Sequence, residues 1–387
     1  MSDCVITRRD LALAAAAGGP AKSKARAQQA PAYGGALQKF EGRIRPELFD
    51  SLAWTRRRYE EMPRRLGFRA RNVREALAWQ RRLRAKLTEL LGGFPPRTPL
   101  RAEVLERREF PAYVRESVIF ESRPGLGVFA YFLIPKDRPQ PRPALICVPG
   151  HGRGADDISG IDEKGQDRTV KGPYQYDFAV QAAERGFAAF AIEPLGFGCR
   201  RDPASRRRGL GQSSCQPAAG AALLFGETMI GWRVYDVMRA VDYLETRPEV
   251  DARRIGLMGI SGGGTITTFG AALEPRIAAA LVSGYLNTFR DSILSIPHCM
   301  DNYVPGILHW CEMHDVAGLI APRPLFCESG EKDDIFPVEA FRHSFAKVQK
   351  IYRIFGAEDR IGSEIFPRGH EFSGRSGFPF LEKHLGA

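Results

Sequence analysis

Short apolar runs alternate with longer amphipathic stretches along most of the chain, and this pattern indicates the order of its secondary structure. Apolar runs bounded by turn residues are typical of strands that are buried on both faces. They predict strands at residues 118–120, 128–134, 144–148, 187–192, 254–260 and 324–329, and a last strand that begins at residue 361. Helical stretches lie between them, as at residues 230–246 and 264–273. This alternation predicts an α/β fold with a mostly parallel central sheet flanked by helices.

The region before the sheet has a different pattern. Residues 37–91 show helical periodicity, with an apolar stripe between arginines, and Gly92-Gly93-Phe94-Pro95-Pro96 ends it. The first two predicted strands, separated by Arg123-Pro124-Gly125, are expected to form a hairpin that opens the sheet. We therefore divide the chain into a leader, an N-terminal helical extension and a catalytic domain, at residues 1–27, 28–109 and 110–387.

The first residues resemble a twin-arginine export leader. Thr7-Arg8-Arg9-Asp10 supplies the paired arginines, residues 13–19 form a modest apolar core, and Ala25-Arg26-Ala27 supplies small residues for cleavage after Ala27. The apolar core is too short and too rich in alanine for a stable membrane span. The sequence therefore predicts a protein exported to the periplasm or beyond the cell, and a cytoplasmic location is the alternative.

A glycine-rich motif connects one predicted strand to the helix after it. Residues 254–260 lead into Gly259-Ile260-Ser261-Gly262-Gly263, which has the form G-x-S-x-G. Side chains two residues either side of the serine would clash in so tight a turn, while the serine hydroxyl must project clear of the backbone. This pattern is the nucleophile elbow of serine hydrolases, so Ser261 is the predicted nucleophile.

An acid and a base follow the serine in the chain order Ser, Asp, His. Asp333 lies in a polar loop after the strand at 324–329, and its neighbour Asp334 is the competing candidate for the acid. His370 lies in a glycine-bearing loop after the last strand, and of the histidines it is the one that fits this order. Catalytic groups gather at the carboxyl ends of strands in open α/β sheets, so we expect Ser261, Asp333 and His370 to form a catalytic triad.

A second loop supplies candidates for stabilising an anionic intermediate. The strand at 144–148 ends in Pro149-Gly150-His151-Gly152-Arg153-Gly154, called the HG loop below. An oxyanion needs main-chain N–H donors, one of which belongs to the residue after the nucleophile, Gly262. We predict that the amide of Arg153 is the second donor, with Gly152 as the alternative. His151 is expected to brace the loop or to contact the substrate.

These segments together resemble the α/β-hydrolase superfamily, and within it the bacterial dienelactone-hydrolase-like and acetylxylan-esterase-like proteins. The resemblance covers about residues 110–387 and rests on the HG loop, the elbow and residues 193–198, 298–300, 303–306 and 320–324. It implies carboxylester hydrolysis, with carbohydrate acyl esters a common substrate. Dienelactone hydrolases have a cysteine nucleophile where this chain has Ser261. Relatives often have aspartate in place of Glu193, which we interpret as a structural brace, with a role as an alternative acid left open.

Composition and charge narrow the classes of partner. A chain with 44% hydrophobic and 26% charged residues is typical of a globular enzyme. The net charge of +11 would suit nucleic acid, but the arginines are scattered among glutamates without a binding motif, so we expect no nucleic-acid partner. The arginine-rich segment 199–215 is a basic surface loop or a loop that favours an anionic substrate such as a uronate ester. Trp232 and Trp310 are candidates for stacking on a sugar ring or for core packing.

Six cysteines remain after the predicted leader is removed. Export permits disulfides, with Cys199–Cys215 and Cys299–Cys311 as candidate pairs. A group of imidazoles and thiols also suggests zinc, namely His298, Cys299, His309, Cys311 and His314. No C-x-x-C pair is present in this group, and the hydrolytic chemistry needs no metal, so we expect neither a metal nor a cofactor.

The sequence therefore predicts a serine carboxylesterase that forms an acyl-enzyme on carbohydrate or small-molecule acyl esters. A peptidase or amidase with the same triad and a noncatalytic carbohydrate-binding relative of the fold are the alternatives. No internal repeat is visible, which argues against the propeller-bearing peptidases that share this fold.

Overall fold

The computed structural model of the chain describes residues 35–40, 42–136 and 139–387. Residues 1–54 and 55–387 form separate units, and each is described by itself. In the first unit, the short 3-10 helices η1 (Gln38–Phe40) and η2 (Pro46–Leu48) precede the start of α2 (Ser51–Glu61). The predicted leader at residues 1–27 lies outside the described residues.

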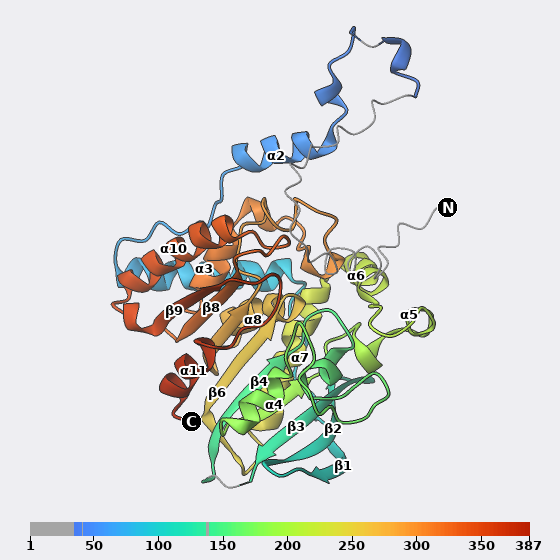
Figure 1. Cartoon of the computed structure of the whole chain (residues 1–387). Coiled ribbons are helices and arrows are strands. Elements are labelled where there is room, and N and C mark those ends of the chain that lie inside the picture. Colours follow the sequence, from blue (N-terminus) through green and yellow to red (C-terminus); the bar gives the residue numbers. More distant parts are fainter. Residues whose placement is uncertain (1–34, 41, 137–138) are drawn as a thin grey trace. The chain divides into compact units, whose positions relative to one another are not determined.

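The second unit is built on one nine-stranded sheet (Figure 1). Its strands are β1 (Glu103–Glu109), β2 (Tyr113–Arg123), β3 (Leu126–Pro135), β4 (Arg142–Val148), β5 (Ala188–Ile192), β6 (Val250–Ile260), β7 (Ile277–Ser283), β8 (Leu325–Gly330) and β9 (Ile361–Phe366). Their order across the sheet is β1-β2-β3-β5-β4-β6-β7-β8-β9. The pairs β1–β2, β2–β3 and β3–β5 are antiparallel, and all later neighbours are parallel. The predicted hairpin is β2–β3, and the predicted α/β fold is confirmed.

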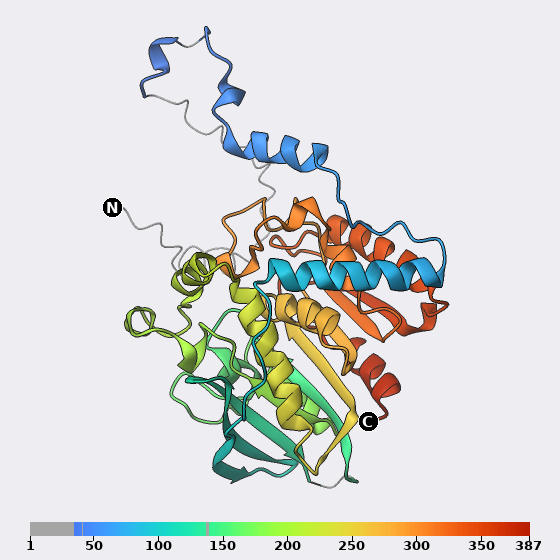
Figure 2. The same cartoon turned by 180° about the vertical axis from the view of Figure 1, so that it is seen from behind.

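Two cores form because side chains alternate between the faces of the sheet. Along β4, Ala144, Ile146 and Val148 belong to one core, and Leu145 and Cys147 belong to the other. The first core is covered by α3 (Val73–Leu90), α7 (Met229–Leu244), α8 (Gly262–Leu273), α9 (Met313–Gly318) and α10 (Val338–Ile354). Figure 2 shows α3, α7 and α8 lying over this face. The second core is covered by α4 (Phe178–Glu184) and α11 (Gly377–Leu385).

Helix α3 is part of the same unit as the sheet, although the sequence placed it in a separate extension. It begins at Val73, where the Asn72 side chain accepts a hydrogen bond from the Glu75 amide at 3.0 Å and so caps the helix. Trp79, Leu83 and Leu87 are buried in the first core. The helical region expected at 37–91 is also interrupted, because residues 62–72 between α2 and α3 are not helical. Among the described residues, no helix is long and apolar enough to span a bilayer.

The parallel strands bring four loops to one edge of the sheet. The HG loop follows β4, Ser261 follows β6, and the segments with Asp333 and His370 follow β8 and β9. Since these strands are parallel, their carboxyl ends lie on the same side, as Figure 1 shows. In open α/β sheets this edge is where ligands bind. The candidate residues therefore converge through topology and not through closeness in sequence.

Candidate active site

The turn at Ser261 has the geometry that the motif predicts. Strand β6 ends at Ile260, α8 begins at Gly262, and Ser261 between them has φ +57° and ψ −120°. A Cβ on Gly263 would stand 2.0 Å from the Val148 carbonyl oxygen, and one on Gly259 would stand 2.6 Å from the Gly263 carbonyl oxygen. Glycine is required at both positions because the backbones pass too closely for any side chain. The strained turn presents Ser261 at the carboxyl edge of the sheet.

Asp333 and His370 form a short, oriented pair. The distance between Asp333 Oδ2 and His370 Nδ1 is 2.7 Å. The other carboxylate oxygen, Oδ1, accepts the amides of Ile335 and Phe336 at 2.9 Å each, which fixes the plane of the carboxylate. Asp333 is buried, whereas Asp334, the competing candidate, is exposed. The structure therefore brings Asp333, and not Asp334, to the imidazole.

The His370 ring is held between two aromatic rings. Tyr174 stacks on it with centroids 5.8 Å apart, and Phe336 does so at 5.6 Å. Gly284 lies against its edge, since a Cβ there would be 3.0 Å from His370 Cε1. Within the described residues, His370 Nε2 has no hydrogen-bond partner although it is buried. The ring is thus oriented by Asp333 and by packing, and its second nitrogen is available to accept a proton.

Tyr174 packs between the histidine and the HG loop. Its ring lies on His370, and its carbonyl accepts the Phe372 amide at 2.8 Å. Burial raises the pKa of Tyr174 well above its ordinary value, so the phenol stays protonated. The hydroxyl sits over Gly150, where a Cβ would come within 2.1 Å of it. Tyr174 was missed from the sequence, because it lies in a loop that no motif marks.

Two amides of the HG loop are already engaged. The Arg153 amide, predicted to face the oxyanion, donates to Asp157 Oδ2 at 2.7 Å, and the Arg153 side chain pairs with Asp157 Oδ1 at 2.6 Å. The Gly150 amide donates to Gln175 Oε1 at 2.8 Å. Among the described residues, the amides of His151 and Gly152 donate no hydrogen bond. The Arg153 amide is therefore not free for its expected donation to an oxyanion, because the Asp157 carboxylate accepts its N–H group.

The His151 ring packs directly on the elbow. Its Nδ1 and Cε1 lie 3.0 Å from where a Cβ on Gly262 would stand, and it contacts the Phe197 ring with centroids 4.7 Å apart. This places the HG loop beside the first amide of α8. The structure thus places His151 against Gly262, the residue that follows Ser261, and the roles of these residues at an oxyanion stay predictions.

Glu193 braces the HG loop from the end of β5. Its Oε1 accepts the Ala155 amide at 3.2 Å, and a Cβ on Gly154 or Gly198 would stand 1.8 or 2.1 Å from its carboxylate. Burial, together with the nearby Asp156, raises its pKa to about 8. The Glu193 carboxylate contacts the loops on either side of it, whereas the carboxylate that pairs with His370 belongs to Asp333. This geometry agrees with the interpretation of Glu193 as a brace.

The two tryptophans pair with groups away from the triad residues. The Trp232 indole donates to the Glu227 carboxylate, and the Trp310 ring lies under Lys86 Nζ, 4.3 Å from its centroid. Among the described residues, neither side chain makes a hydrogen bond or ring contact with Ser261, Asp333 or His370. Their expected stacking on a sugar ring stays a prediction.

The arginine-rich segment uses its own guanidinium groups to hold its shape. It contains α5 (Pro203–Arg207) and ends at the start of α6 (Cys215–Leu224). Arg201 donates to the carbonyls of Gly198, Gly209 and Gln212, and Arg206 donates to that of Cys199. A hollow of about 420 Å³ lies beside this segment, and its lining combines the arginines Arg153, Arg201 and Arg206 with the acids Asp156, Asp162, Glu163 and Glu193. The expected preference of this segment for an anionic substrate stays a prediction.

The cysteines differ from the pairings suggested by the sequence. Cys147, Cys199, Cys215, Cys299, Cys311 and Cys327 are all free thiols. Cys199 is exposed while Cys215 is buried, and Cys299 lies beside Cys215 instead of Cys311. Neither proposed disulfide is formed, because the loops that carry these residues fold in other directions.

Comparisons with known proteins agree with the fold. The model of the Abhydrolase family matches residues 59–370. "Putative hydrolase YtaP" of Bacillus subtilis is 28% identical over 284 residues, which are 71% of this chain and 89% of that protein. A "putative acetyl xylan esterase" structure from Bacteroides fragilis has a TM-score of 0.76 at 20% identity and covers 87% of this chain and 95% of its own. A glucuronoyl esterase from Solibacter usitatus has a TM-score of 0.62 at 17% identity, over 84% of this chain and 98% of its own. At these identities, the structural likeness shows the fold alone.

Proposed function

Since this chain belongs to the Abhydrolase family, we propose that it is a serine carboxylesterase that works through an acyl-enzyme intermediate. The observation that carries the proposal is the Asp333–His370 pair, in which His370 Nε2 has no hydrogen-bond partner among the described residues. Tyr174 stacks on the same imidazole and places its hydroxyl over Gly150 in the HG loop. A nucleophile on a strained elbow, a base oriented by a buried acid and an unpaired base nitrogen are the components of a hydrolytic triad.

The first half of the reaction transfers the acyl group to the enzyme. Nε2 of His370 takes the proton of the Ser261 hydroxyl as Oγ attacks the ester carbonyl. Asp333 keeps the proton of the imidazole on Nδ1 and stabilises the imidazolium that forms. His370 then gives the proton to the leaving alkoxide, so an alcohol departs and an ester to Ser261 remains. Water repeats the sequence through His370 and releases the acid.

Two main-chain amides are needed to stabilise the tetrahedral oxyanion. Gly262 is the first, because its N–H opens α8 and benefits from the positive end of the helix dipole. The Arg153 amide is held by Asp157, so the second donor is assigned to His151 or Gly152, whose amides are unpaired in the described structure. His151 is favoured because its ring contacts Gly262.

Carbohydrate acyl esters are the first substrates to test. Two similar solved structures carry the names acetyl xylan esterase and glucuronoyl esterase, which supports this class for the present chain. We also propose that residues 1–27 are an export leader. Export would place the enzyme outside the cytoplasm, where it meets polymeric carbohydrates.

Labelling with a fluorophosphonate tests the nucleophile. Wild type and Ser363→Ala, which removes an exposed serine on β9, are expected to label, and Ser261→Ala is expected not to. Peptide mapping should place the adduct on Ser261. A folded wild-type sample that takes no label, or an adduct on another serine, would count against the proposal and in favour of a binding role.

Matched ester and amide substrates separate the esterase from a peptidase or amidase. An amine must be protonated as it leaves, which demands closer placement of His370 than an alkoxide does. We expect turnover of acetyl esters and little turnover of the corresponding amides. Comparable kcat/KM values for the two would favour the peptidase alternative.

A further inference from the structure

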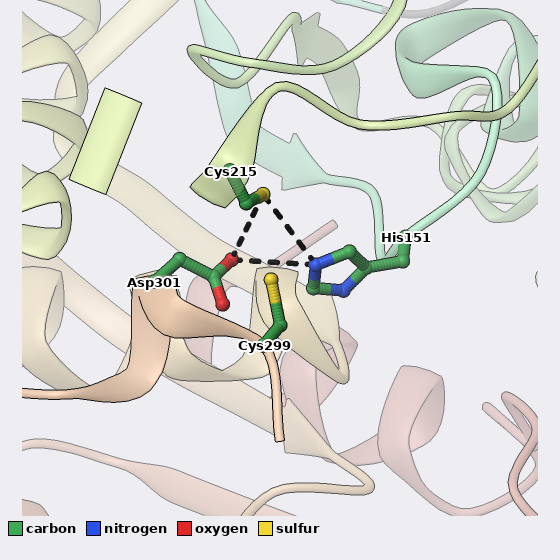
Figure 3. Close-up of side chains that lie close together, drawn as sticks. All are labelled: His151, Cys215, Cys299 and Asp301. Atoms are coloured by element: carbon green, nitrogen blue, oxygen red, sulfur yellow. Dashed lines mark hydrogen bonds and ion pairs between the residues drawn. The ribbon is translucent and has the colours of Figure 1, made fainter. Parts of the chain in front are cut away.

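Four side chains with metal-binding atoms converge beside the elbow, and the mechanism above does not use them. They are His151, Cys215, Cys299 and Asp301, whose ligand atoms all lie within 4.8 Å of one another. In Figure 3 they point toward a common centre. His151 lies in the HG loop, and Cys215 is the first residue of α6. Cys299 and Asp301 belong to the segment at η5 (Met300–Asn302). Three segments far apart in sequence therefore meet at this point.

The separations between these atoms match a tetrahedral zinc site. His151 Nε2 lies 3.6 Å from Cys215 Sγ and 3.5 Å from Asp301 Oδ2, and Cys215 Sγ lies 3.7 Å from Asp301 Oδ2. Tetrahedral zinc with bonds of about 2.0–2.3 Å places nitrogen, oxygen and sulfur ligands about 3.3–3.8 Å apart. A cation that draws four ligands onto itself would shorten the remaining, longer separations. We propose that His151, Cys215, Cys299 and Asp301 bind one zinc ion.

The ligand types select zinc over other common divalent ions. Thiolate and imidazole suit zinc, whereas magnesium and calcium prefer oxygen ligands. With four protein ligands the site has no open position, which is the arrangement of a structural zinc site. Binding forms two Zn–S bonds and releases to solvent the protons that the thiols still carry.

A buried arginine completes the charge of the site. The Arg233 guanidinium donates to Asp301 Oδ2, and its Nη2 lies 3.3 Å from Cys215 Sγ. Two thiolates and one carboxylate carry three negative charges, and a divalent cation with Arg233 supplies three positive charges. Hydrogen bonds from outside the ligand set are common around metal sites and orient the ligands. Buried charges need this kind of compensation.

The metal would fasten the loops that surround the nucleophile. The His151 ring contacts both the site and Gly262, so an ion bound at Nε2 would fix the HG loop against the elbow. A disulfide between Cys215 and Cys299 is the competing arrangement, in which His151 would keep its contact with Asp301, and Asp301 its contacts with His151 and Arg233. The proposal is independent of the esterase function, because it concerns how the loops are held.

Metal content tests the site directly. The full chain, expressed in zinc-supplemented medium and purified under reducing conditions, should carry about one zinc per chain by elemental mass spectrometry. Cys299→Ser and Asp301→Asn should lose it, and the control Cys311→Ser, which removes a buried thiol outside the group, should retain it. Equal zinc content in all three variants, or absence of zinc from the wild type, would overturn the proposal.

A second measurement covers variants that fail to fold. Chelator-treated, reduced wild type that is shown by circular dichroism to be folded is titrated with Zn²⁺ and, separately, with Co²⁺. We expect saturation at one ion per chain, thiolate-to-cobalt charge-transfer absorption, and a rise in Tm on zinc binding. Failure of this reduced protein to take up either ion would contradict the proposal, as would cobalt spectra without thiolate bands.

Discussion

Replacing Asp333 with asparagine should nearly abolish turnover while leaving the fold intact. Oδ1 of Asp333 accepts two amides, from Ile335 and Phe336, at 2.9 Å each. An asparagine must keep its oxygen there, so its NH₂ group turns toward His370 Nδ1, where the carboxylate oxygen now accepts at 2.7 Å. His370 must then carry its proton on Nε2, and that tautomer cannot accept the proton of Ser261.

The expected loss is about 10⁴-fold in kcat, or about 5 kcal/mol of transition-state stabilisation, as for the equivalent change in serine proteases. The assay is kcat and KM on an acetyl ester of a chromogenic phenol, with Tm as the check on folding. Asp334→Asn is the matched control, since it makes the same change one residue away on an exposed side chain. Loss of less than about tenfold for Asp333→Asn, or equal losses for both variants, would refute the assignment of the acid.

Three further changes probe the surroundings of the site, and a fourth is a control. Tyr174→Phe keeps the ring that stacks on His370 and removes the hydroxyl that lies over Gly150, so acylation should slow by no more than roughly tenfold in stopped-flow measurements. The pKa of Glu193 is raised from 4.5 to about 8. Its contribution to stability is therefore full below pH 4.5 and is lost as the pH rises through about 8. Glu193→Gln should flatten the fall of Tm across that window. Gly263→Ala should cost about 2–3 kcal/mol in denaturant unfolding, because its Cβ would stand 2.0 Å from a main-chain oxygen. Gly220→Ala in α6, with nothing within 4 Å, should instead stabilise by up to about 1 kcal/mol.

The sequence could predict the features that depend on local geometry. The glycines around Ser261 reveal the elbow, because a turn that passes so close to Val148 excludes every other residue. Apolar runs and helical periodicity predict the α/β fold, since burial on both faces of a parallel sheet leaves a continuous apolar pattern. The order of Ser261, Asp333 and His370 along the chain follows from the fold.

Features that depend on how a loop turns were harder to predict. Asp333 was the predicted acid with Asp334 as its competitor, and the structure distinguishes them because Asp333 Oδ1 accepts the amides of Ile335 and Phe336. The capture of the Arg153 amide by Asp157 depends on how the HG loop turns.

The metal-binding group shows the same limit. The sequence suggested a cluster of close neighbours around Cys299, whereas the atoms that meet belong to residues 151, 215, 299 and 301. Spacing along the chain carries little signal for such a group, because its four ligands come from three different connections of the sheet.

Trapping the acyl-enzyme tests the central claim most directly. The wild type is mixed with an activated acetyl ester, quenched in acid within the burst phase, and digested for mass spectrometry. The account predicts one acetyl group on the peptide that contains Ser261, and none on that peptide in Ser261→Ala. Steady turnover of the ester by Ser261→Ala, or acetyl transfer to a different residue in the wild type, would contradict it.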